Sequence, residues 1–197
     1  SLTLVKADDR RLPLFSKFLE DLSGLASCLR GGEETGGPGD LPAIRLGESW
    51  VFHLIPEGTE LDPFLKLVAG SARGEADLPS GLSEKLKRIE TPATVDLFVS
   101  TRCPHCAHVL GGIGLFPFAN RLLRIRAIDG MLFPEKAEEH SIRAVPTLLL
   151  PDGERFTGQA EPAEVADALI IRDPSRMGPE ALARMIRAGD AQGLADM

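Results

Sequence analysis

The chain has 197 residues, of which 43% are hydrophobic and 26% charged, the balance of a globular protein with one or two domains. Its net charge of −7 argues against nucleic acid as the main partner, because binding phosphate requires clustered Lys and Arg. No apolar run approaches the roughly 20 residues that span a bilayer, and charged residues between 6 and 11 exclude a signal-peptide apolar core there. We therefore expect no nucleic-acid partner, no membrane partner and a cytoplasmic location.

The first half of the chain is predicted to combine helices with one strand pair. Helices are predicted from apolar residues at helical spacing, strands from short apolar runs, and loops from clustered Gly, Ser and Pro. The predicted elements are, in order, a helix over 9–29, a Gly-rich exposed loop over 31–40, strands over 43–46 and 49–55 that form a hairpin around Gly47-Glu48, a helix over 61–68, a loop over 71–82 and a short helix over 82–89.

The second half has a clearer pattern of alternating strands and helices. The predicted elements are a buried strand over 93–99, a helix over 106–118, a strand over 122–128, a helix over 133–140, strands over 145–150 and 154–157 joined by an Asp152-Gly153 turn, and a helix that opens at Pro162 and runs to 170. Gly111, Gly112 and Gly114 weaken the 106–118 helix by up to ~1 kcal/mol each. Pro117 is predicted to bend or end it.

Two charged or polar features are interpreted as structural. Arg121, Arg124 and Arg126 lie close together on a predicted strand edge and are interpreted as solvated charge. His53 follows Phe52 in a predicted strand, which favours a structural role over a functional one.

Two of the three cysteines, Cys103 and Cys106, are spaced Cys-x-x-Cys directly after the predicted strand 93–99. This spacing places both sulfurs on one helical turn, where they can form and break a disulfide with little movement of the backbone. Structural zinc sites generally use four ligands, so redox chemistry is favoured, with a metal site that includes His105 or His108 as the alternative. The third cysteine, Cys28, is interpreted as a small buried apolar residue or, alternatively, an oxidisable thiol.

The order of residues in the motif assigns a role to each. Unpaired N–H groups at a helix N-terminus stabilise a thiolate, which makes Cys103 the attacking nucleophile. Pro104 suits the first helical turn, where its missing N–H costs nothing. His105 can carry positive charge or donate a hydrogen bond beside the thiolate, while His108, one turn further on, is predicted to face solvent. Cys106 is the resolving thiol that releases a mixed disulfide.

The stretch from Val95 to Leu169 resembles thioredoxin and glutaredoxin-like proteins. It most resembles the N-terminal domain of the alkyl hydroperoxide reductase flavoprotein and the archaeal protein disulfide oxidoreductases. The segments that carry this resemblance are Cys103-Pro104-His105-Cys106, Ala127-Ile128-Asp129-Gly130, Val145-Pro146 and, in the first half, Ile55-Pro56-Glu57-Gly58-Thr59-Glu60-Leu61. The resemblance implies an α/β fold class with two tandem thioredoxin-like folds, the second of which carries the Cys-x-x-Cys site. The implied domains are an inactive one over 1–88, an active one over 90–172 and a helical tail over 173–197.

The resemblance also implies site residues outside the Cys motif. Pro146 is expected to follow a cis peptide bond that brings the backbone of Val145 beside the Cys pair, where a substrate chain can hydrogen-bond. The buried Asp that assists the resolving thiol in thioredoxin is replaced here by Leu97, and strand alternation points the neighbouring Asp96 to the other face. Glu60 matches the Glu that fills this role in the flavoprotein domain, so it is predicted to be the general base for Cys106. The alternative is an exposed helix-start carboxylate.

We therefore predict dithiol–disulfide exchange with protein substrates, in the reducing direction. No Gly-x-Gly-x-x-Gly fingerprint is found, so electrons are expected from a separate thioredoxin-reductase-like donor, with no cofactor beyond the Cys103–Cys106 pair. The Pro104-His105 dipeptide is that of the DsbA type and favours a disulfide oxidase or isomerase as the alternative. A redox-regulated interaction or metal-binding module is the alternative from another class. The amphipathic 173–197 segment is predicted either to pack on the domain or to belong to a larger protein.

Overall fold

The computed structural model describes residues 1–26, 31–75, 77–101 and 103–171. Cys28 and the predicted tail over 173–197 lie outside the described residues. The first half contains β1 (Leu2–Lys6), α1 (Leu12–Leu25), β2 (Gly31–Thr35), β3 (Ala43–Leu46), β4 (Trp50–His53), the 3-10 helix η1 (Gly58–Glu60) and α2 (Leu61–Arg73). The second half contains α3 (Ser80–Lys87), β5 (Ala93–Val99), α4 (Pro104–Ile113), α5 (Phe116–Ala119), β6 (Leu123–Asp129), α6 (Pro134–Glu139), β7 (Thr147–Leu149), β8 (Arg155–Thr157) and α7 (Pro162–Ile171).

All the described strands belong to one eight-stranded sheet, in the order β2-β1-β3-β4-β6-β5-β7-β8. In the first half β1 pairs parallel with β2 and antiparallel with β3, which pairs antiparallel with β4. In the second half β5 pairs parallel with β6 and antiparallel with β7, which pairs antiparallel with β8. The two halves therefore repeat one pattern, and parallel pairing of β4 with β6 joins them.

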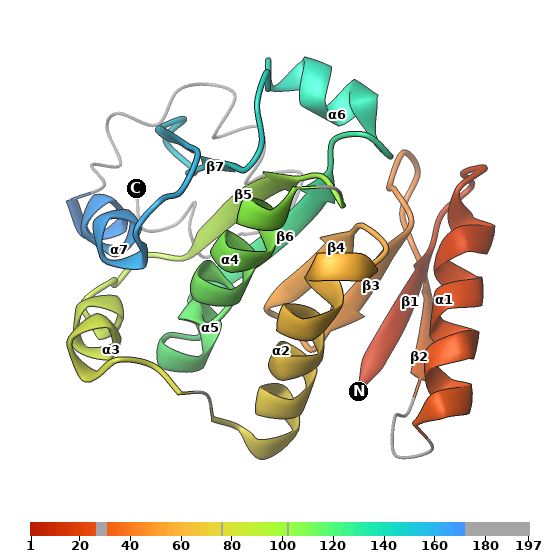
Figure 1. Cartoon of the computed structure of the whole chain (residues 1–197), viewed down its shortest axis with the longest axis horizontal. Coiled ribbons are helices and arrows are strands. Elements are labelled where there is room, and N and C mark those ends of the chain that lie inside the picture. Colours follow the sequence, from red (N-terminus) through yellow and green to blue (C-terminus); the bar gives the residue numbers. More distant parts are fainter. Residues whose placement is uncertain (27–30, 76, 102, 172–197) are drawn as a thin grey trace.

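Helices α1, α2 and α4 lie side by side over one face of this sheet (Figure 1). Phe18 of α1 meets Phe64 of α2 with ring centroids 6.0 Å apart, and Phe64 in turn packs edge-on against Phe52 of β4 at 5.1 Å. Helix α2 packs against α4 on its other side. Helix α4, which carries the Cys motif at its N-terminal end, is thus packed against a helix of the first half.

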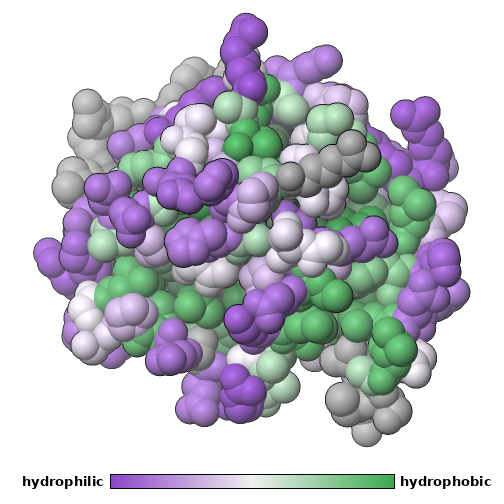
Figure 2. Space-filling model, in the orientation of Figure 1, coloured by the Kyte–Doolittle hydropathy of each residue, from purple (hydrophilic) through white to green (hydrophobic). Residues whose placement is uncertain are grey.

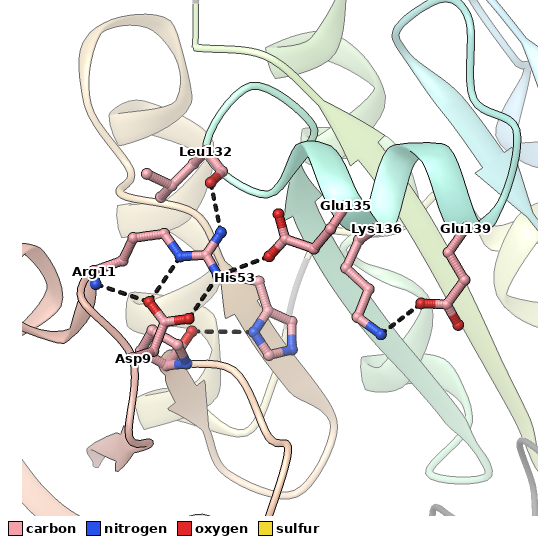
Figure 3. A network of polar contacts seen from close by, with 8 residues as sticks. Asp9, Arg11, His53, Leu132, Glu135, Lys136 and Glu139 are labelled. Atoms are coloured by element: carbon pink, nitrogen blue, oxygen red, sulfur yellow. Dashed lines mark hydrogen bonds and ion pairs between the residues drawn. The ribbon is translucent and has the colours of Figure 1, made fainter.

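Polar contacts fasten the halves together at opposite ends of the sheet. At one end the buried indole Nε1 of Trp50 donates a hydrogen bond to the carbonyl of Gly114 at 2.7 Å. At the other end Arg11 donates to the carbonyl of Leu132 at 2.8 Å and pairs with Glu135 at 2.7 Å (Figure 3). The Arg11 guanidinium lies 4.0 Å from the centre of the Phe133 ring, a cation–π contact. These contacts resist movement of one half against the other.

His53 lies beside this Arg11 cluster and is partly buried (Figure 3). Its Nδ1 is 3.1 Å from the carbonyl oxygen of Pro42, and its ring meets Phe133 edge-on at 6.0 Å. Burial lowers the pKa of His53 to about 4, so the ring is neutral at physiological pH. This environment agrees with the predicted structural role.

The surface gives little indication of a large apolar interface. Among the described residues, the exposed large apolar side chains are Leu14 and Leu25 at the two ends of α1, Leu65 of α2, and Leu122 and Met131 in connecting segments. On the face shown in Figure 2, hydrophilic and hydrophobic residues are interspersed. Isolated exposed apolar residues are ordinary on a protein surface and need no partner. Among the described helices, none is both long and apolar enough to cross a membrane.

The second half matches its predicted elements closely, whereas the first half departs from them. Strand β5 coincides with the predicted strand, and the Asp152-Gly153 turn and the helix from Pro162 are confirmed. The prediction that 31–40 is a loop is wrong over 31–35, because β1 supplies a parallel ladder for β2. Strand β1 itself was not predicted. The predicted loop over 71–82 is shorter, since α2 continues to Arg73 and α3 begins at Ser80.

The predicted helix over 106–118 is divided into α4 and α5. The division falls at Gly114 and Leu115, and Pro117 lies in the first turn of α5. The prediction that Pro117 bends or ends the first helix is therefore wrong. Gly114 is required by close packing, because a Cβ there would lie 2.5 Å from the Leu110 carbonyl oxygen and 2.9 Å from Cδ1 of Leu67. The chain turns where α4 meets α2.

The packing of α4 against α2 leads to opposite predictions for the effect of an alanine at Gly111 and at Gly114 on the free energy of unfolding. Gly111 lies inside α4, and a Cβ there would meet Cβ of Pro63 at 3.7 Å, an ordinary contact. Gly111→Ala is therefore expected to raise the free energy of unfolding by about 0.5–1 kcal/mol through helix propensity alone. Gly114→Ala is expected to lower it by about 1–3 kcal/mol through overpacking, as measured by urea denaturation. A Gly114→Ala protein as stable as the parent would contradict this account of the helix break.

Candidate active site

The Cys motif lies where β5 ends and α4 begins. Cys103 is the N-cap of α4 in an extended conformation, and Pro104 is the first helical residue, as predicted. The Cys106 backbone N–H donates to the Cys103 carbonyl at 3.0 Å, which places the two residues on one turn. Both cysteines are free thiols. Cys103 thus lies at the N-terminal end of the helix, which is the positive end of the helix dipole.

The two sulfurs have different environments. Cys103 is partly exposed, and its thiol donates to the carbonyl of Val145 at 3.8 Å. Cys106 is fully buried. Burial raises the pKa of the Cys106 thiol to about 12, and the hydrogen bond with Cys103 and the negative charge of Glu60 act in the same direction. Cys106 therefore stays protonated at neutral pH unless another group accepts its proton.

The Val145–Pro146 peptide bond is cis, as the resemblance implied. Pro146 is buried and directly precedes β7, which pairs with β5. The carbonyl of Val145 consequently faces the sulfur of Cys103 across the end of the sheet. The structure brings Cys103, Val145 and Pro146 together as predicted from sequence.

His105 and His108 are both exposed on α4, which agrees with the prediction that His108 faces solvent. The Nδ1 of His105 lies 2.6 Å from Nε2 of Gln159, a hydrogen bond between residues 54 positions apart. Gln159 was not identified by sequence analysis. It lies in the connection between β8 and α7, and no local pattern distinguishes it from other polar loop residues.

Glu60 ends η1, which packs against α4. Its side chain is fully buried, so the alternative of an exposed helix-start carboxylate is wrong. The Thr59 hydroxyl donates to Oε2 at 3.2 Å, while Oε1 has no hydrogen-bond partner among the described residues. Burial raises the pKa of Glu60, and the Asp129 carboxylate nearby acts in the same direction. The charge of Glu60 in turn raises the pKa of Cys106, which lies on the helix against which η1 packs.

Asp96, a buried acid of the second half, is on the opposite face of β5 from Leu97, as alternation predicted. It accepts two hydrogen bonds from Arg126, from Nε at 2.8 Å and Nη2 at 2.7 Å. The interpretation of Arg126 as solvated charge is therefore wrong, because its guanidinium is paired with a buried carboxylate. Arg121 and Arg124 are exposed, as predicted. Among the described residues, no group of three or more His, Cys, Asp and Glu side chains could hold a metal ion.

Comparison with known proteins agrees with the resemblance. No protein-family model matches the sequence. The alkyl hydroperoxide reductase component AhpF of Staphylococcus epidermidis is 31% identical over 156 residues, which are 79% of this chain and 25% of that protein. Its counterpart in Pseudomonas aeruginosa is 29% identical over 102 residues, 52% of this chain and 19% of that protein. The chain thus spans a quarter or less of the length of these curated relatives.

Two solved structures share the fold. The N-terminal domain of the alkyl hydroperoxide reductase AhpF from Enterococcus faecalis matches with a TM-score of 0.72 at 20% identity, covering 86% of this chain and 90% of that one. A protein disulfide oxidoreductase from Aeropyrum pernix matches with a TM-score of 0.72 at 14% identity, covering 86% of this chain and 83% of that one. The chain is a mixed α/β, thioredoxin-like protein similar to the AhpF N-terminal domain, as the sequence resemblance predicted.

The raised pKa of Glu60 predicts how stability depends on pH. A carboxyl whose pKa is higher in the folded than in the unfolded state stabilises the fold below the unfolded pKa of about 4.3, and this contribution is lost as pH rises through the folded pKa. Glu60→Gln cannot ionise, so its melting temperature is expected to exceed that of the parent at pH 8 and to equal it near pH 4.

Asp96→Asn is the matched control, because Asp96 is a buried carboxylate that has a bonded cation. Its loss leaves the Arg126 guanidinium without that partner and is expected to cost roughly 3 kcal/mol at neutral pH. Thermal unfolding of both variants from pH 4 to pH 8 measures the difference. A Glu60→Gln protein less stable than the parent at pH 8 would show that the Glu60 carboxylate is stabilised in the fold.

Proposed function

We propose that this chain is a thiol–disulfide oxidoreductase that exchanges dithiol and disulfide with other proteins through Cys103 and Cys106. The observation that carries the proposal is the asymmetry of the pair. Cys103 is partly exposed at a helix N-terminus beside the Val145 carbonyl, and Cys106 is buried one turn behind it. An exposed sulfur can attack a substrate, and a buried neighbour can release the product only after attack has occurred.

In the reducing direction the thiolate of Cys103 attacks one sulfur of a substrate disulfide. The substrate S–S bond breaks, its other sulfur leaves with the electron pair and takes up a proton, and a mixed disulfide forms. Cys106 then loses its proton and attacks the sulfur of Cys103. The mixed disulfide breaks, the second substrate sulfur leaves as a thiolate that takes up a proton, and two electrons have passed to the substrate. The backbone of Val145 can hydrogen-bond an extended substrate chain during these steps.

Glu60 is proposed as the base that accepts the proton of Cys106. It supplies a carboxylate close to the buried thiol. Its raised pKa makes its proton affinity closer to that of the Cys106 thiolate than the proton affinity of an exposed carboxylate would be. Leu97 supplies no such group from β5. The first half would then contribute a residue to chemistry that takes place in the second.

This role fits the proposed domain organisation. We propose that 1–88 and 90–172 are tandem thioredoxin-like folds, supported by the repeated strand order of the two halves. The reductase portions of the longer relatives suggest, for this chain, a separate thioredoxin-reductase-like electron donor and a cytoplasmic place in a peroxide-reducing system. Pro104-His105 favours a DsbA-type oxidase or isomerase as the second candidate, because the exposed imidazole can stabilise a thiolate and hence the reduced form.

Insulin reduction with dithiothreitol as electron source tests the proposed activity. The parent protein is expected to accelerate precipitation of insulin chains, and Cys103→Ser to reduce the rate to the background. Cys106→Ser is expected to lose turnover but to accumulate a mixed disulfide with the substrate, because the attacking sulfur remains. Loss of both the rate and the adduct in Cys106→Ser would contradict the assigned order of the two sulfurs.

The reduction potential of the pair, measured against glutathione buffers, separates the two candidates. A value near about −270 mV supports a reductase, and a value near about −120 mV supports an oxidant. A protein without exchange activity whose Cys pair binds stoichiometric zinc when freshly purified would instead support the metal-binding alternative.

The role of Glu60 is tested by the pH dependence of the second step. Glu60→Gln is expected to slow release of the mixed disulfide by roughly 10²-fold at neutral pH, the lower range of general base catalysis, with little effect on the attack by Cys103. Single-turnover measurement of adduct formation and decay from pH 6 to pH 10 resolves both steps. An unchanged decay rate and pH profile would exclude Glu60 as the base.

A further inference from the structure

Residues 158–161, which connect β8 to α7, and Pro162, the first residue of α7, are together called the strap below, and they link the loop of the cis Pro146 to α4. Gly158 has φ +90°, a conformation that favours glycine, and its N–H donates to the carbonyl of Pro146 at 2.8 Å. Ala160 is buried, and Pro162 packs so closely on α4 that a Cβ at Gly112 would lie 3.0 Å from its Cγ. The strap is thus anchored at both ends and in the middle.

Gln159 is the residue of the strap that lies between these anchors, and its side chain is exposed. Its amide Nε2 lies 2.6 Å from Nδ1 of His105. An amide nitrogen carries two protons and no acceptor lone pair, so it donates and Nδ1 accepts. A neutral imidazole that accepts at Nδ1 carries its proton on Nε2. The contact therefore selects one tautomer of His105 and fixes the ring toward the strap.

We propose that Gln159 is a positioning residue for His105, which it holds in the Nε2–H tautomer beside the Cys pair. This proposal rests on the proposed function, since it concerns the same site. An exposed imidazole is otherwise free to rotate in solvent. The anchored backbone of the strap fixes the position of the Gln159 amide, so its hydrogen bond can hold the His105 ring in one orientation. Gln159 touches neither sulfur in any contact among the described residues and acts through His105.

The chemical consequence concerns the sulfur that leaves the substrate. With Nδ1 occupied by Gln159, the exposed ring offers Nε2–H as its remaining donor. When Cys103 attacks, the departing substrate sulfur carries the electron pair of the broken S–S bond. Nε2–H can donate a hydrogen bond to that charge without transferring its proton, so the ring ends the step as it began. The same donor can stabilise the thiolate of the reduced Cys103.

Other titratable groups share these elements and belong in the interpretation of the test. Cys103, Cys106 and His108 are on α4 or its N-cap, and Glu161 is on the strap. Gln159 itself does not titrate, so a change seen in Gln159 variants does not arise from its own protonation.

Nitrogen-15 NMR of the histidine rings at pH 8 tests the tautomer directly in the full chain, with His105→Ala identifying the signals. In the parent protein Nδ1 of His105 is expected at the chemical shift of an unprotonated ring nitrogen and Nε2 at that of a protonated one. Gln159→Leu is expected to give the averaged shifts of a mixture. Gln159→Glu offers only acceptors and is expected to move the proton to Nδ1. A parent ring protonated at Nδ1, or unchanged shifts in Gln159→Leu, would overturn the proposal.

A double-mutant cycle on the glutathione exchange constant tests whether Gln159 acts through His105. Gln159→Leu is expected to change this constant by roughly two- to tenfold, the effect of one hydrogen bond, and to have no effect in the His105→Ala background. Glu164→Gln, an exposed position in the first turn of α7, serves as the control and is expected to change it less than about twofold. An equal effect of Gln159→Leu in both backgrounds would refute positioning through His105. If the pair fails to exchange at all, the proposed function fails, while the tautomer measurement still decides the role of Gln159.

Discussion

Burial of the Cys106 thiol in the first turn of α4 is the constraint on which the candidate site depends. A thiol whose pKa is about 12 does not ionise in neutral solution, so a buried resolving cysteine needs a proton acceptor inside the protein. The carboxyl that the structure places near it, Glu60, is itself buried with a raised pKa. Burial thus affects both groups in the same direction, since for each of them the lack of water disfavours the charged form. Transfer of a proton from the Cys106 thiol to the Glu60 carboxylate therefore costs less free energy than transfer from a buried thiol to an exposed carboxylate.

This enclosure exists only because two halves of the chain form one sheet. Glu60 comes from η1 of the first half and Cys106 from α4 of the second, and η1 packs directly against α4. Pairing of β4 with β6 sets the halves side by side, and the Trp50 indole bonds to the end of α4. A glycine at the close approach of α4 to α2, Gly114, lets the helix end where Leu67 would otherwise clash. The position of the buried acid is therefore a property of the interface between the halves.

A structural feature could be predicted from sequence when the residues that determine it lie close together along the chain. The Cys spacing, Pro104 and Pro146 are set by backbone geometry over a few residues, and β5 is β-branched and apolar along its length. Strand β2, with the sequence GGEET, has no strand-forming composition, and its ladder comes from β1. The Arg126 pair requires knowledge of the register between β5 and β6. Gln159 meets His105 only through the folded path of the strap, and Glu60 was identified through a family resemblance because burial of a helix-start carboxylate is not visible in a local pattern.

The repeated topology places two loops in equivalent positions, and they have diverged. In the second half the loop between β5 and α4 ends at Cys103, the N-cap of the helix that contains Cys106, and is called the Cys loop here. In the first half the loop between β1 and α1 carries Asp9 and Arg11. Their ion pair lowers the pKa of Asp9 to about 2. The same guanidinium also binds the Leu132 carbonyl and the Glu135 carboxylate (Figure 3). The segment it binds begins at Asp129 and Gly130, and the Gly130 N–H donates to the carbonyl of Val99 at the end of β5, just before the Cys loop. Asp129 also raises the pKa of Glu60. The loop between β1 and α1, which has no thiol, thus holds in place the segment bonded to the start of the Cys loop. One loop of the repeated fold therefore supports the chemistry of the equivalent loop in the other half.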